Sequence, residues 1–576
     1  MALKDSIVIV LCGEAGQGIQ TIETFLTRLF KNAGYQIFAA KEYMSRIRGG
    51  SNSTEIRISS HPVAAFSERI DLLIPLDKEA IPHLGKRITP ETQILGEVAK
   101  ILPPDSIPVE DIPFSKIAAE IGNPVFSNMV ACGVIAGLFA ISPELTSTQV
   151  SKFFASKSAE IINKNLEAVK RGYQLGIQLR TKAPGQYLFD LPVDSTVQNH
   201  IIANGAEAVA LGALAGGCNF ISSYPMSPGT GVLTYMAQCS RDIPVVVEQA
   251  EDEISAINMA LGAWYAGARA IITTSGGGFA LMTEGISLAG MIESPVVVHL
   301  AQRPGPATGL PTRTEQADLE LVLYAGHGEF PRIILAPGNI NEAFYLAQKA
   351  FQLADQFQVP VFILTDQYLV DSYCNLPAFD PSKFPVAEHI IETPPDYRRY
   401  QFTDIGISPR GIPGYGKGLV GVDSDEHDET GHITEDLDLR IRMNQKRLQK
   451  LSTIKQTIIS PELVGNPDYQ ILIVSWGSTF EMIKEAMAII DFPDLALLHF
   501  KQVFPLNPGV STYLKKATRT IIVENNATSQ FGKLIQLATG ITIQNQILKY
   551  DGMPFSVEEL VERIGEIMGR SENHEY

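Results

Sequence analysis

The chain has 576 residues, enough for roughly three or four domains of about 150 residues each. Its 45% hydrophobic and 19% charged residues are typical of a globular protein and exclude a disordered one. The net charge of −17 argues against nucleic acid as a main partner, because a protein that follows the phosphate backbone needs a basic surface.

The five cysteines are scattered and never form a CxxC pair. This indicates free thiols in a reducing, cytoplasmic compartment, and it provides no ligand set for an iron–sulfur cluster. The N-terminus lacks a signal-peptide pattern, and the longest apolar run, Met129–Ile141, is shorter than the ~20 residues that span a bilayer. We therefore expect no membrane segment and interpret this run as a buried helix with Ser127 or Asn128 as its N-cap.

The first segment, residues 1–182, opens with an apolar strand (Ile7–Cys12), the glycine turn GEAGQGIQ (13–20) and a helical pattern, as an α/β unit does. Backbone amides in such a turn can bind a phosphate, but the turn matches neither the dinucleotide fingerprint nor the P-loop. A tight turn without a ligand is an equal alternative. Further along, Arg46 and Arg48 stand just before a glycine pair. They could bind an anionic group there, and the alternative is a solvated loop.

Changes in composition divide the rest of the chain. A polar stretch at 183–196 predicts a linker, after which helices and strands alternate over 197–375 as in a parallel sheet covered on both faces. Residues 376–465 break this rhythm and predict a long connector that contains an exposed helix at 433–451. A last α/β block occupies 466–576. We therefore predict an α/β chain of three domains with mainly parallel sheets.

The loop SYPMSPGTG directly follows a predicted strand, the place where open α/β sheets bind ligands. Its prolines fix backbone angles, its glycines allow close approach, and Ser227 offers a hydroxyl. We interpret this loop as a binding loop rather than as a structural turn.

Two arginines border the loop GPATGLPT. Arg303 stands at the carboxyl end of a predicted strand, where a guanidinium can bind a substrate carboxylate with two hydrogen bonds. Arg313 comes ten residues later. A surface ion pair with Glu315 or Asp318 is a better alternative for Arg313 than for Arg303.

Four acids, Glu248, Glu251, Asp252 and Glu253, stand where a strand leads into an apolar helix. One interpretation is that all four only cap and solvate the helix, where each acid contributes about 0.3–1 kcal/mol. The other is that one of them works on a cofactor, from a partly apolar pocket that tunes its pKa for proton sharing.

Four stretches together resemble the α subunit of 2-oxoacid:ferredoxin oxidoreductases, most closely those assigned to 2-oxoglutarate: YPMSP, EQAEDEISAINMALGAWYAGARA, TSGGGFALMTEGISLAG and AQRPGPATGLPTRTEQADL. The first segment is similar to the γ subunit of that family, fused ahead of α, with GEAGQGIQ and IRGGSNS as its marks. The resemblance covers essentially the whole chain. It implies a γ-type domain followed by two domains like those of thiamine enzymes, one pyrimidine-binding and one similar to the transketolase C-terminal domain.

The resemblance implies thiamine diphosphate as the cofactor. In thiamine enzymes the activating glutamate contacts N1′ of the aminopyrimidine and lies about nine positions before a glycine; counted back from Gly262, this position is Glu253. Glu251 is the reserve candidate. The residues expected to bind the cofactor are therefore Tyr224, Pro225, Met226, Ser227 and Glu253.

The resemblance also implies how a substrate binds. YPMSP departs from the more frequent YPITP, although Met226 keeps an apolar contact and Ser227 keeps a hydroxyl. Arg303 is expected to hold the substrate carboxylate, with Ser227 near the reacting carbonyl. A second carboxylate, as in 2-oxoglutarate, needs another cation or donor, for which the candidates are Arg48, Arg313, Lys41 and Arg46.

Part of the family's apparatus is missing, namely the GDG…N stretch that binds magnesium and diphosphate and the cysteines that bind a cluster. In the family, magnesium and [4Fe-4S] belong to a separate β subunit, which implies activity only with that partner, in an (αβ)2 assembly. The implied reaction is CoA-dependent oxidative decarboxylation of a 2-oxoacid with ferredoxin as electron acceptor, or the reverse reductive carboxylation. The alternatives are another 2-oxoacid such as pyruvate, a non-catalytic nucleotide-binding assembly subunit, and a self-contained thiamine enzyme.

Overall fold

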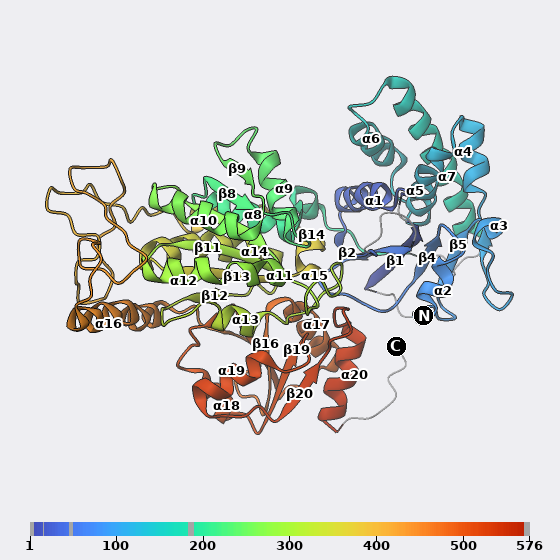
Figure 1. Ribbon diagram of the computed structural model, residues 1–576. Coiled ribbons are helices and arrows are strands. Elements are labelled where there is room, and N and C mark those ends of the chain that lie inside the picture. Colours follow the sequence, from blue (N-terminus) through green and yellow to red (C-terminus); the bar gives the residue numbers. More distant parts are fainter. Residues whose placement is uncertain (1–4, 15, 45–49, 183–188, 570–576) are drawn as a thin grey trace. The chain divides into compact units, whose positions relative to one another are not determined.

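The computed structural model describes residues 5–14, 16–44, 50–182 and 189–569. The chain divides into two compact units (Figure 1). Unit 1 consists of Met1–Ala203 and Ser372–Ala378, and unit 2 consists of Asn204–Asp371 and Phe379–Tyr576.

Unit 1 is built on an eight-stranded mixed sheet. Its strands are β1 (Ser6–Glu14), β2 (Gln36–Glu42), β3 (Ser51–Ser59), β4 (Leu72–Pro75), β5 (Gln93–Gly96), β6 (Glu110–Asp111), β7 (Ile201–Asn204) and β14 (Tyr373–Leu376). They lie in the order β6-β5-β4-β1-β3-β2-β14-β7. Strands β1, β4, β5 and β6 are parallel neighbours, whereas β3 pairs antiparallel with β1 and β2, and β14 pairs antiparallel with β2.

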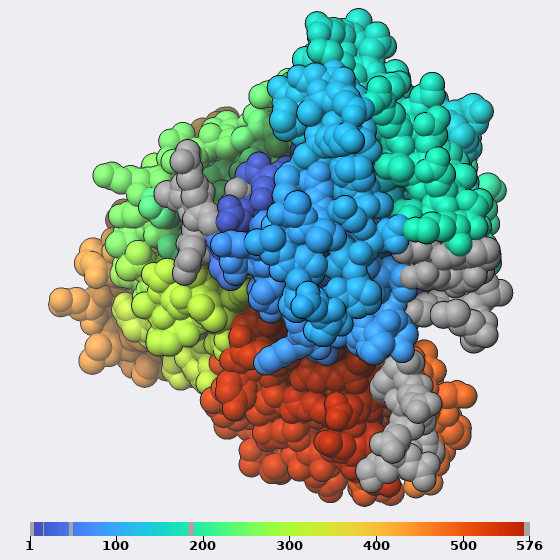
Figure 2. All heavy atoms as spheres, turned by 90° about the vertical axis from the view of Figure 1, so that its right-hand side faces the viewer, coloured from blue at the N-terminus to red at the C-terminus, as the bar shows by residue number. Residues whose placement is uncertain are grey.

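Seven helices of the described part of unit 1 cover this sheet. They are α1 (Ile19–Ala33), α2 (Ala80–Leu84), α3 (Val98–Ile101), α4 (Phe114–Ile121), α5 (Ser127–Leu138), α6 (Pro143–Phe153) and α7 (Ala159–Lys182). Figure 2 shows the segment that carries α2, α3 and α4, in blue, on the surface of unit 1. Successive side chains of a strand point to opposite faces, so Ile9 and Leu11 of β1 join the core with α1 and α5, while Val8 and Val10 join a smaller core on the other face.

The apolar run in this unit forms the predicted buried helix. Residues Met129–Leu138 of α5 are all buried, and α7 packs directly against them. A Cβ added at Gly133 would collide with the backbone of Val169 in α7, and one added at Gly172 would collide with the backbone of Val130 in α5. The glycines therefore allow a close helix contact that larger residues would block.

The predicted N-cap of this helix is wrong. Neither Ser127 nor Asn128 caps α5, because the helix continues from a 3-10 turn, η1 (Pro124–Phe126), and Phe126 occupies the cap position. The side chain that accepts a backbone amide is that of Asn123, at the start of this turn. Among the described helices none is long and apolar enough to cross a membrane.

Unit 2 contains two sheets, of which the larger has seven strands. These are β8 (Phe220–Ser223), β9 (Val246–Gln249), β10 (Ala270–Thr274), β11 (Val296–Gln302), β12 (Ile333–Leu335), β13 (Pro360–Asp366) and β18 (Gln502–Phe504). They lie in the order β18-β12-β13-β11-β10-β8-β9, and every pair is parallel except β12 with β18. The alternating helices are α8 (Gly205–Ala215), α9 (Thr230–Cys239), α10 (Glu253–Tyr265), α11 (Gly276–Leu281), α12 (Thr283–Met291), α13 (Leu319–Tyr324), α14 (Ile340–Phe357) and α15 (Gln367–Asp371). The predicted alternation of strand and helix is confirmed here.

The smaller sheet of unit 2 has five strands in the order β15-β17-β16-β19-β20. Its strands are β15 (Glu462–Gly465), β16 (Ile471–Trp476), β17 (Leu495–Phe500), β19 (Arg519–Glu524) and β20 (Asn545–Leu548). Only β15 is antiparallel to its neighbour. The helices that accompany it are α17 (Phe480–Ile490), α18 (Val510–Lys516), α19 (Gln530–Thr539) and α20 (Val557–Ile567). Short 3-10 turns elsewhere in the described residues include η2 (Ser195–Asn199), which belongs to unit 1, and η3 (Pro381–Lys383), η4 (Lys455–Thr457) and η5 (Gly477–Thr479), which belong to unit 2.

The connector ahead of this sheet contains α16 (Leu437–Ile454), the helix predicted to be exposed. That prediction is wrong for one face of the helix, because Met443, Lys446 and Lys450 are buried. Nζ of Lys446 and Nζ of Lys450 lie 2.7 and 2.6 Å from the buried carboxylate of Glu293. A paired carboxylate makes the burial of two lysines possible, so this basic helix packs inward against a distant acid.

Candidate active site

The candidate residues of unit 2 gather at one edge of the seven-stranded sheet. Strands β8, β9, β10 and β11 are parallel, so the loops that follow them leave the sheet on the same side. The loop after β8 carries Ser227, the turn after β9 leads to Glu253, and Arg303 directly follows β11. Segments that lie up to about 80 residues apart in the sequence therefore meet at this edge, as parallel strand ends do.

The four acids at the start of α10 have different surroundings. Glu248 and Glu251 are exposed, and Asp252 is the N-cap, because its side chain accepts a hydrogen bond from the backbone N of Ser255 at 2.7 Å. Glu253 is only 3% exposed. Capping and solvation therefore account for three of the acids but not for Glu253, which is the acid that sequence reasoning selected.

Glu253 has the features of a functional carboxylate. Its Oε1 atom is buried and has no hydrogen-bond partner within the described ranges. Burial raises the pKa of Glu253; a hydrogen bond from the backbone opposes this shift, and the charge of Asp252 adds to it. Buried carboxylate oxygens are normally paired, so an unpaired one requires an explanation.

The glycine-rich first turn of α11, directly after β10, packs against this carboxylate. A Cβ added at Gly278 would collide with Oε1 of Glu253 and with the hydroxyl of Thr274, whereas one at Gly277 would meet only the backbone O of Ala307 at 3.8 Å. Gly278 therefore leaves the space that the Glu253 side chain occupies. The run SGGGF has a packing role at this one position that sequence reasoning did not identify.

Ser227 and Arg303 lie together. Nη1 of Arg303 donates to the backbone O of Ser227 at 2.7 Å, while Nε of Arg303 is buried and has no partner in the part of the chain that the structure describes. The side chains of Tyr224 and Ser227 are exposed, and that of Met226 is half-buried. The loop thus presents its side chains outward while its backbone is held by the arginine.

A chain of buried hydrogen bonds holds the backbone of this loop at Gly229. The Thr273 hydroxyl donates to the backbone O of Gly229 at 2.9 Å and lies 2.8 Å from Nδ1 of His299. Nε2 of His299 lies 2.7 Å from the hydroxyl of Thr365. Burial lowers the pKa of His299 to about 3, so the imidazole is neutral and acts here as a structural hydrogen-bonding group.

Sequence reasoning missed Asp318 as a member of the site. Its carboxylate packs on Gly276, and its Oδ2 atom is buried without a partner among the residues that the structure describes. Burial raises the pKa of Asp318 to about 6, although the positive charge of Arg303 lowers it. The sequence had suggested Asp318 as a partner for Arg313; in the structure its charge acts on Arg303.

The other predicted cations have contacts of their own or lie outside the described residues. Nη1 of Arg313 lies 3.3 Å from Sδ of Met553, against the loop after β20. Lys41 belongs to unit 1, where its Nζ pairs with Glu23 at 3.3 Å. Arg46 and Arg48 lie outside the described residues. The role of these four in binding a second carboxylate stays a prediction.

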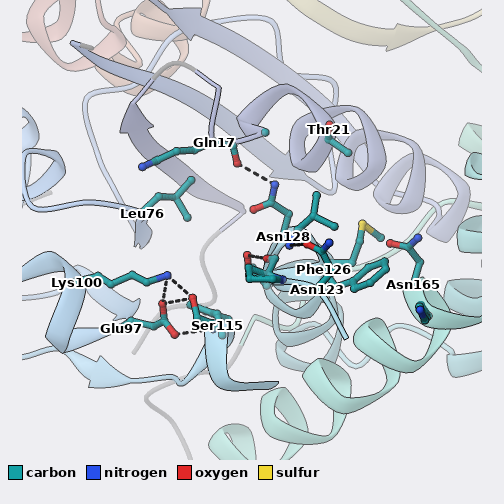
Figure 3. A pocket seen from close by; sticks show the side chains of 18 of the residues that line it. Gln17, Thr21, Leu76, Glu97, Lys100, Ser115, Asn123, Phe126, Asn128 and Asn165 are labelled. Atoms are coloured by element: carbon teal, nitrogen blue, oxygen red, sulfur yellow. Dashed lines mark hydrogen bonds and ion pairs between the residues drawn. The ribbon is translucent and has the colours of Figure 1, made fainter. Parts of the chain in front are cut away.

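The turn GEAGQGIQ of unit 1 borders a cavity of about 790 Å³ (Figure 3). Gly16 and Gly18 have φ values of 94° and 80°, which favour glycine, and a Cβ added at Gly18 would collide with the amide of Asn128. That amide donates to the backbone O of Gln17 at 2.9 Å, and Figure 3 shows it pointing at the turn. On another wall, Nζ of Lys100 lies 2.7 Å from Glu97. The cavity is therefore lined by neutral amides and apolar side chains, together with two lysines, Lys100 and Lys164, that are each paired with a glutamate.

Within the described residues, no group of three or more His, Cys, Asp or Glu side chains is arranged to hold a metal ion. The five cysteines, all among the described residues, form no disulfide, and burial raises the pKa of Cys12 to about 12. This chain therefore presents acid, hydroxyl and guanidinium groups, which can bind an organic cofactor and a carboxylate.

Family comparisons agree with this arrangement of groups. A family model described as pyruvate flavodoxin/ferredoxin oxidoreductase, thiamine diphosphate-binding, matches residues 211–446, and one described as pyruvate ferredoxin/flavodoxin oxidoreductase matches residues 8–175. The first match includes Ser227, Glu253 and Arg303. The α/β fold, the acid site and these matches define an oxidoreductase subunit with a thiamine-binding domain.

Comparison with whole proteins narrows this class. The α subunits of 2-oxoacid:ferredoxin oxidoreductases from Sulfolobus sp and Sulfurisphaera tokodaii are each 32% identical to this chain, over 96% of it and 96% of the relative. A solved structure of 2-oxoglutarate:ferredoxin oxidoreductase from Magnetococcus marinus, with 2-oxoglutarate, coenzyme A and succinyl-CoA bound, is 31% identical, with a TM-score of 0.91 over 98% of this chain and 99% of the other. The chain belongs to the family of 2-oxoacid:ferredoxin oxidoreductase α subunits.

Proposed function

We propose that this chain is the α subunit of a thiamine diphosphate-dependent enzyme that decarboxylates 2-oxoglutarate oxidatively, with coenzyme A as acyl acceptor, or runs the reverse carboxylation. The observation that carries the proposal is the buried Oε1 of Glu253, which has no hydrogen-bond partner in the described part of the chain. The choice of substrate rests on the Magnetococcus marinus relative, whose structure contains 2-oxoglutarate, coenzyme A and succinyl-CoA. Pyruvate remains the alternative substrate to be tested.

The environment of Glu253 fits the aminopyrimidine of thiamine diphosphate. A carboxylate whose pKa is raised by burial holds a proton readily, so Glu253 can share one with N1′ of the pyrimidine. When bound, thiamine diphosphate supplies the carbon nucleophile for the 2-oxo carbon and takes up the electrons that decarboxylation leaves. Tyr224, Pro225 and Met226 lie on the same sheet edge and provide contact surface for the cofactor.

Arg303 and Ser227 are the proposed substrate-binding residues. Nη1 of Arg303 is already held by the Ser227 backbone, and its buried Nε is left for an oxygen of the substrate carboxylate. The exposed Ser227 hydroxyl is placed to donate to the carbonyl oxygen of the same substrate. The hydrogen bond between the two residues fixes their relative position, which favours one orientation of the 2-oxoacid.

The proposed enzyme needs a β subunit. The described residues contain no metal-ligand group, and the cysteines of the sequence are too widely spaced for a cluster. We therefore assign magnesium, the diphosphate site and [4Fe-4S] to β, with ferredoxin as the electron acceptor and (αβ)2 as the assembly. The proposed location is the cytoplasm, in keeping with free cysteines.

We further propose that the unit 1 cavity binds a phosphate-bearing part of coenzyme A. The glycine turn borders the cavity beside the neutral amide of Asn128 and leads into the N-terminus of α1, and Lys100 and Lys164 add positive charge to the lining, which suits an anionic group. Gly18→Ala places a methyl group against Asn128, so KM for coenzyme A is expected to rise at least tenfold while KM for 2-oxoglutarate stays unchanged. An unchanged KM for coenzyme A in the folded variant would refute this assignment.

The function is tested on the natural complex of this chain with its β partner. The measurements are the thiamine and iron content and the coenzyme A-dependent reduction of a viologen, with 2-oxoglutarate and pyruvate as alternative substrates. We expect bound thiamine and a higher kcat/KM for 2-oxoglutarate. A complex without thiamine and without activity on any 2-oxoacid would contradict the proposal and favour a non-catalytic assembly subunit. Activity of the isolated chain would instead indicate a self-contained thiamine enzyme.

A further inference from the structure

Unpaired polar atoms collect at the sheet edge where Arg303 lies. Among the residues described, Ser275 Oγ, Arg303 Nε and Asp318 Oδ2 are buried and lack a hydrogen-bond partner, as does Glu253 Oε1. Glu253 and Arg303 have roles in the proposed function, whereas Asp318 has none. An unpaired buried carboxylate oxygen beside an unpaired buried guanidinium nitrogen requires an explanation.

The backbone places Asp318 next to Arg303. The backbone N of Asp318 donates to Oε1 of Gln302 at 3.0 Å, and Gln302 directly precedes Arg303. Both carboxylate oxygens of Asp318 lie 2.5 Å from the position that a Cβ of residue 276 would take, so the carboxylate is packed on the backbone of Gly276. The Gln302 side chain is itself held, because its Nε2 donates to the backbone O of Thr365 at 3.0 Å. The carboxylate therefore has a fixed position.

The charges around Asp318 are unbalanced once a substrate arrives. Arg303 is the cation that acts on Asp318, and Glu315, whose pKa is raised to about 7 by burial and by the charges of Asp318 and Asp551, adds negative charge nearby. The Glu253 carboxylate lies against Gly278 of α11, and the Asp318 carboxylate lies against Gly276 of the same helix. In the free site Arg303 and Asp318 balance each other, but a substrate carboxylate on Arg303 would add a second anion.

Two carboxylates that share one guanidinium repel each other, which raises their pKa values and most strongly affects a carboxylate that is already desolvated. The repulsion therefore favours protonation of one of the two. Asp318 is fixed by its backbone and its packing, and burial has already moved its pKa to about 6, so it is the group that takes up the proton.

We propose that Asp318 is a positioning residue that accepts one proton from solvent when the carboxylate of a 2-oxoacid binds Arg303. Protonated Asp318 stops competing for the guanidinium, which then holds the substrate with its full charge. Proton uptake thus accompanies substrate binding, and no bond of the substrate changes in this step. This inference rests on the proposed function, since it takes the 2-oxoacid as the ligand of Arg303.

The test is the pH dependence of kcat and KM for 2-oxoglutarate, measured between pH 6 and 9 on the complex with its β partner at saturating coenzyme A. For the wild-type complex we expect kcat/KM to fall about tenfold per pH unit above neutrality, through KM and with little change in kcat. Asp318→Asn carries no charge, so its kcat/KM should be flat over this range and exceed that of the wild type at pH 8. Glu315→Gln is the matched control and should keep the fall, displaced toward lower pH.

Retention of the same fall in Asp318→Asn, or a flat wild-type profile, would overturn the inference. If Asp318→Asn does not fold, the uptake is measured on the wild-type complex freed of thiamine diphosphate, by calorimetric titration of 2-oxoglutarate at pH 7.5 in two buffers of different ionisation enthalpy. An uptake close to one proton supports the inference, and binding without uptake overturns it. Failure of the proposed function is distinguishable, because it would leave the wild-type complex inactive on every 2-oxoacid before any variant is compared.

Discussion

Substitution of Gly278 by alanine tests whether the position of the Glu253 carboxylate matters for activity. The added Cβ would collide with Oε1 of Glu253 and with the Thr274 hydroxyl, so one of these side chains must move. Thr274 lies in the buried strand β10, whereas the Glu253 carboxylate has an unpaired oxygen and is held less firmly. We expect the Glu253 carboxylate to be displaced.

The size of the effect follows from this contact. Overpacking a buried position costs roughly 1–3 kcal/mol, partly offset here because alanine favours a helix over glycine by about 0.5–1 kcal/mol. The fold should therefore survive. A misplacement of about 1 Å in a reacting group lowers the rate about 10²-fold, so kcat should fall by about that factor.

The assay is the coenzyme A-dependent reduction of a viologen with 2-oxoglutarate by the complex with β, together with its thiamine content. Gly277→Ala is the matched control, since it makes the same chemical change one residue earlier and its Cβ meets only the backbone O of Ala307 at 3.8 Å. We expect Gly277→Ala to retain activity within about threefold. Equal activity of the two variants would refute the reasoning that Gly278 makes room for a functional Glu253.

Three further predictions concern stability, measured by urea unfolding of the complex or by its Tm. Asp252→Ala removes the N-cap of α10 and should lower the free energy of unfolding by about 1 kcal/mol. An unchanged Tm would contradict the cap assignment. Gly176→Ala places a methyl group against the backbone O of Val134 at the α5–α7 contact and should lower the free energy of unfolding by about 1–3 kcal/mol. An unchanged free energy of unfolding would contradict this close contact between the helices. Burial raises the pKa of Glu342, but His499 and Lys501 outweigh this and lower it to about 2; its ionised form therefore stabilises the fold above pH about 4.5, and this stability is lost as pH falls toward 2. Glu342→Gln should thus destabilise at pH 7 by about 3 kcal/mol, and a deficit that fails to shrink below pH 4.5 would contradict this sign.

Local sequence patterns predicted much of unit 2. Strand and helix alternate there as the hydrophobic periods indicate, and Glu253, which the family resemblance selected, is more deeply buried than its three acidic neighbours. The meeting of Ser227 with Arg303 was also predictable, because both follow parallel strands. These features depend on short segments and on one general property of parallel sheets.

Pairings between distant segments could not be predicted in the same way. Strand β14 joins the sheet of unit 1 beside β2, and β18 joins the seven-stranded sheet of unit 2 from beyond the connector. The burial of Lys450 depends on Glu293, more than a hundred residues away, and no periodicity within α16 reveals that acid. Asp318 was overlooked for the same reason, since its position depends on the backbone of Gly276.

The central claim is that Glu253 is the carboxylate that activates the cofactor. The most direct test compares Glu253→Gln with Glu251→Gln in the complex with β, by kcat for 2-oxoglutarate and by bound thiamine. We predict that Glu253→Gln lowers kcat by about 10²–10⁴-fold with thiamine still bound, because a positioned acid–base group contributes that factor, and that Glu251→Gln, at an exposed position, stays near the wild type. Near-native kcat in Glu253→Gln, or a comparable loss in Glu251→Gln, would contradict the account.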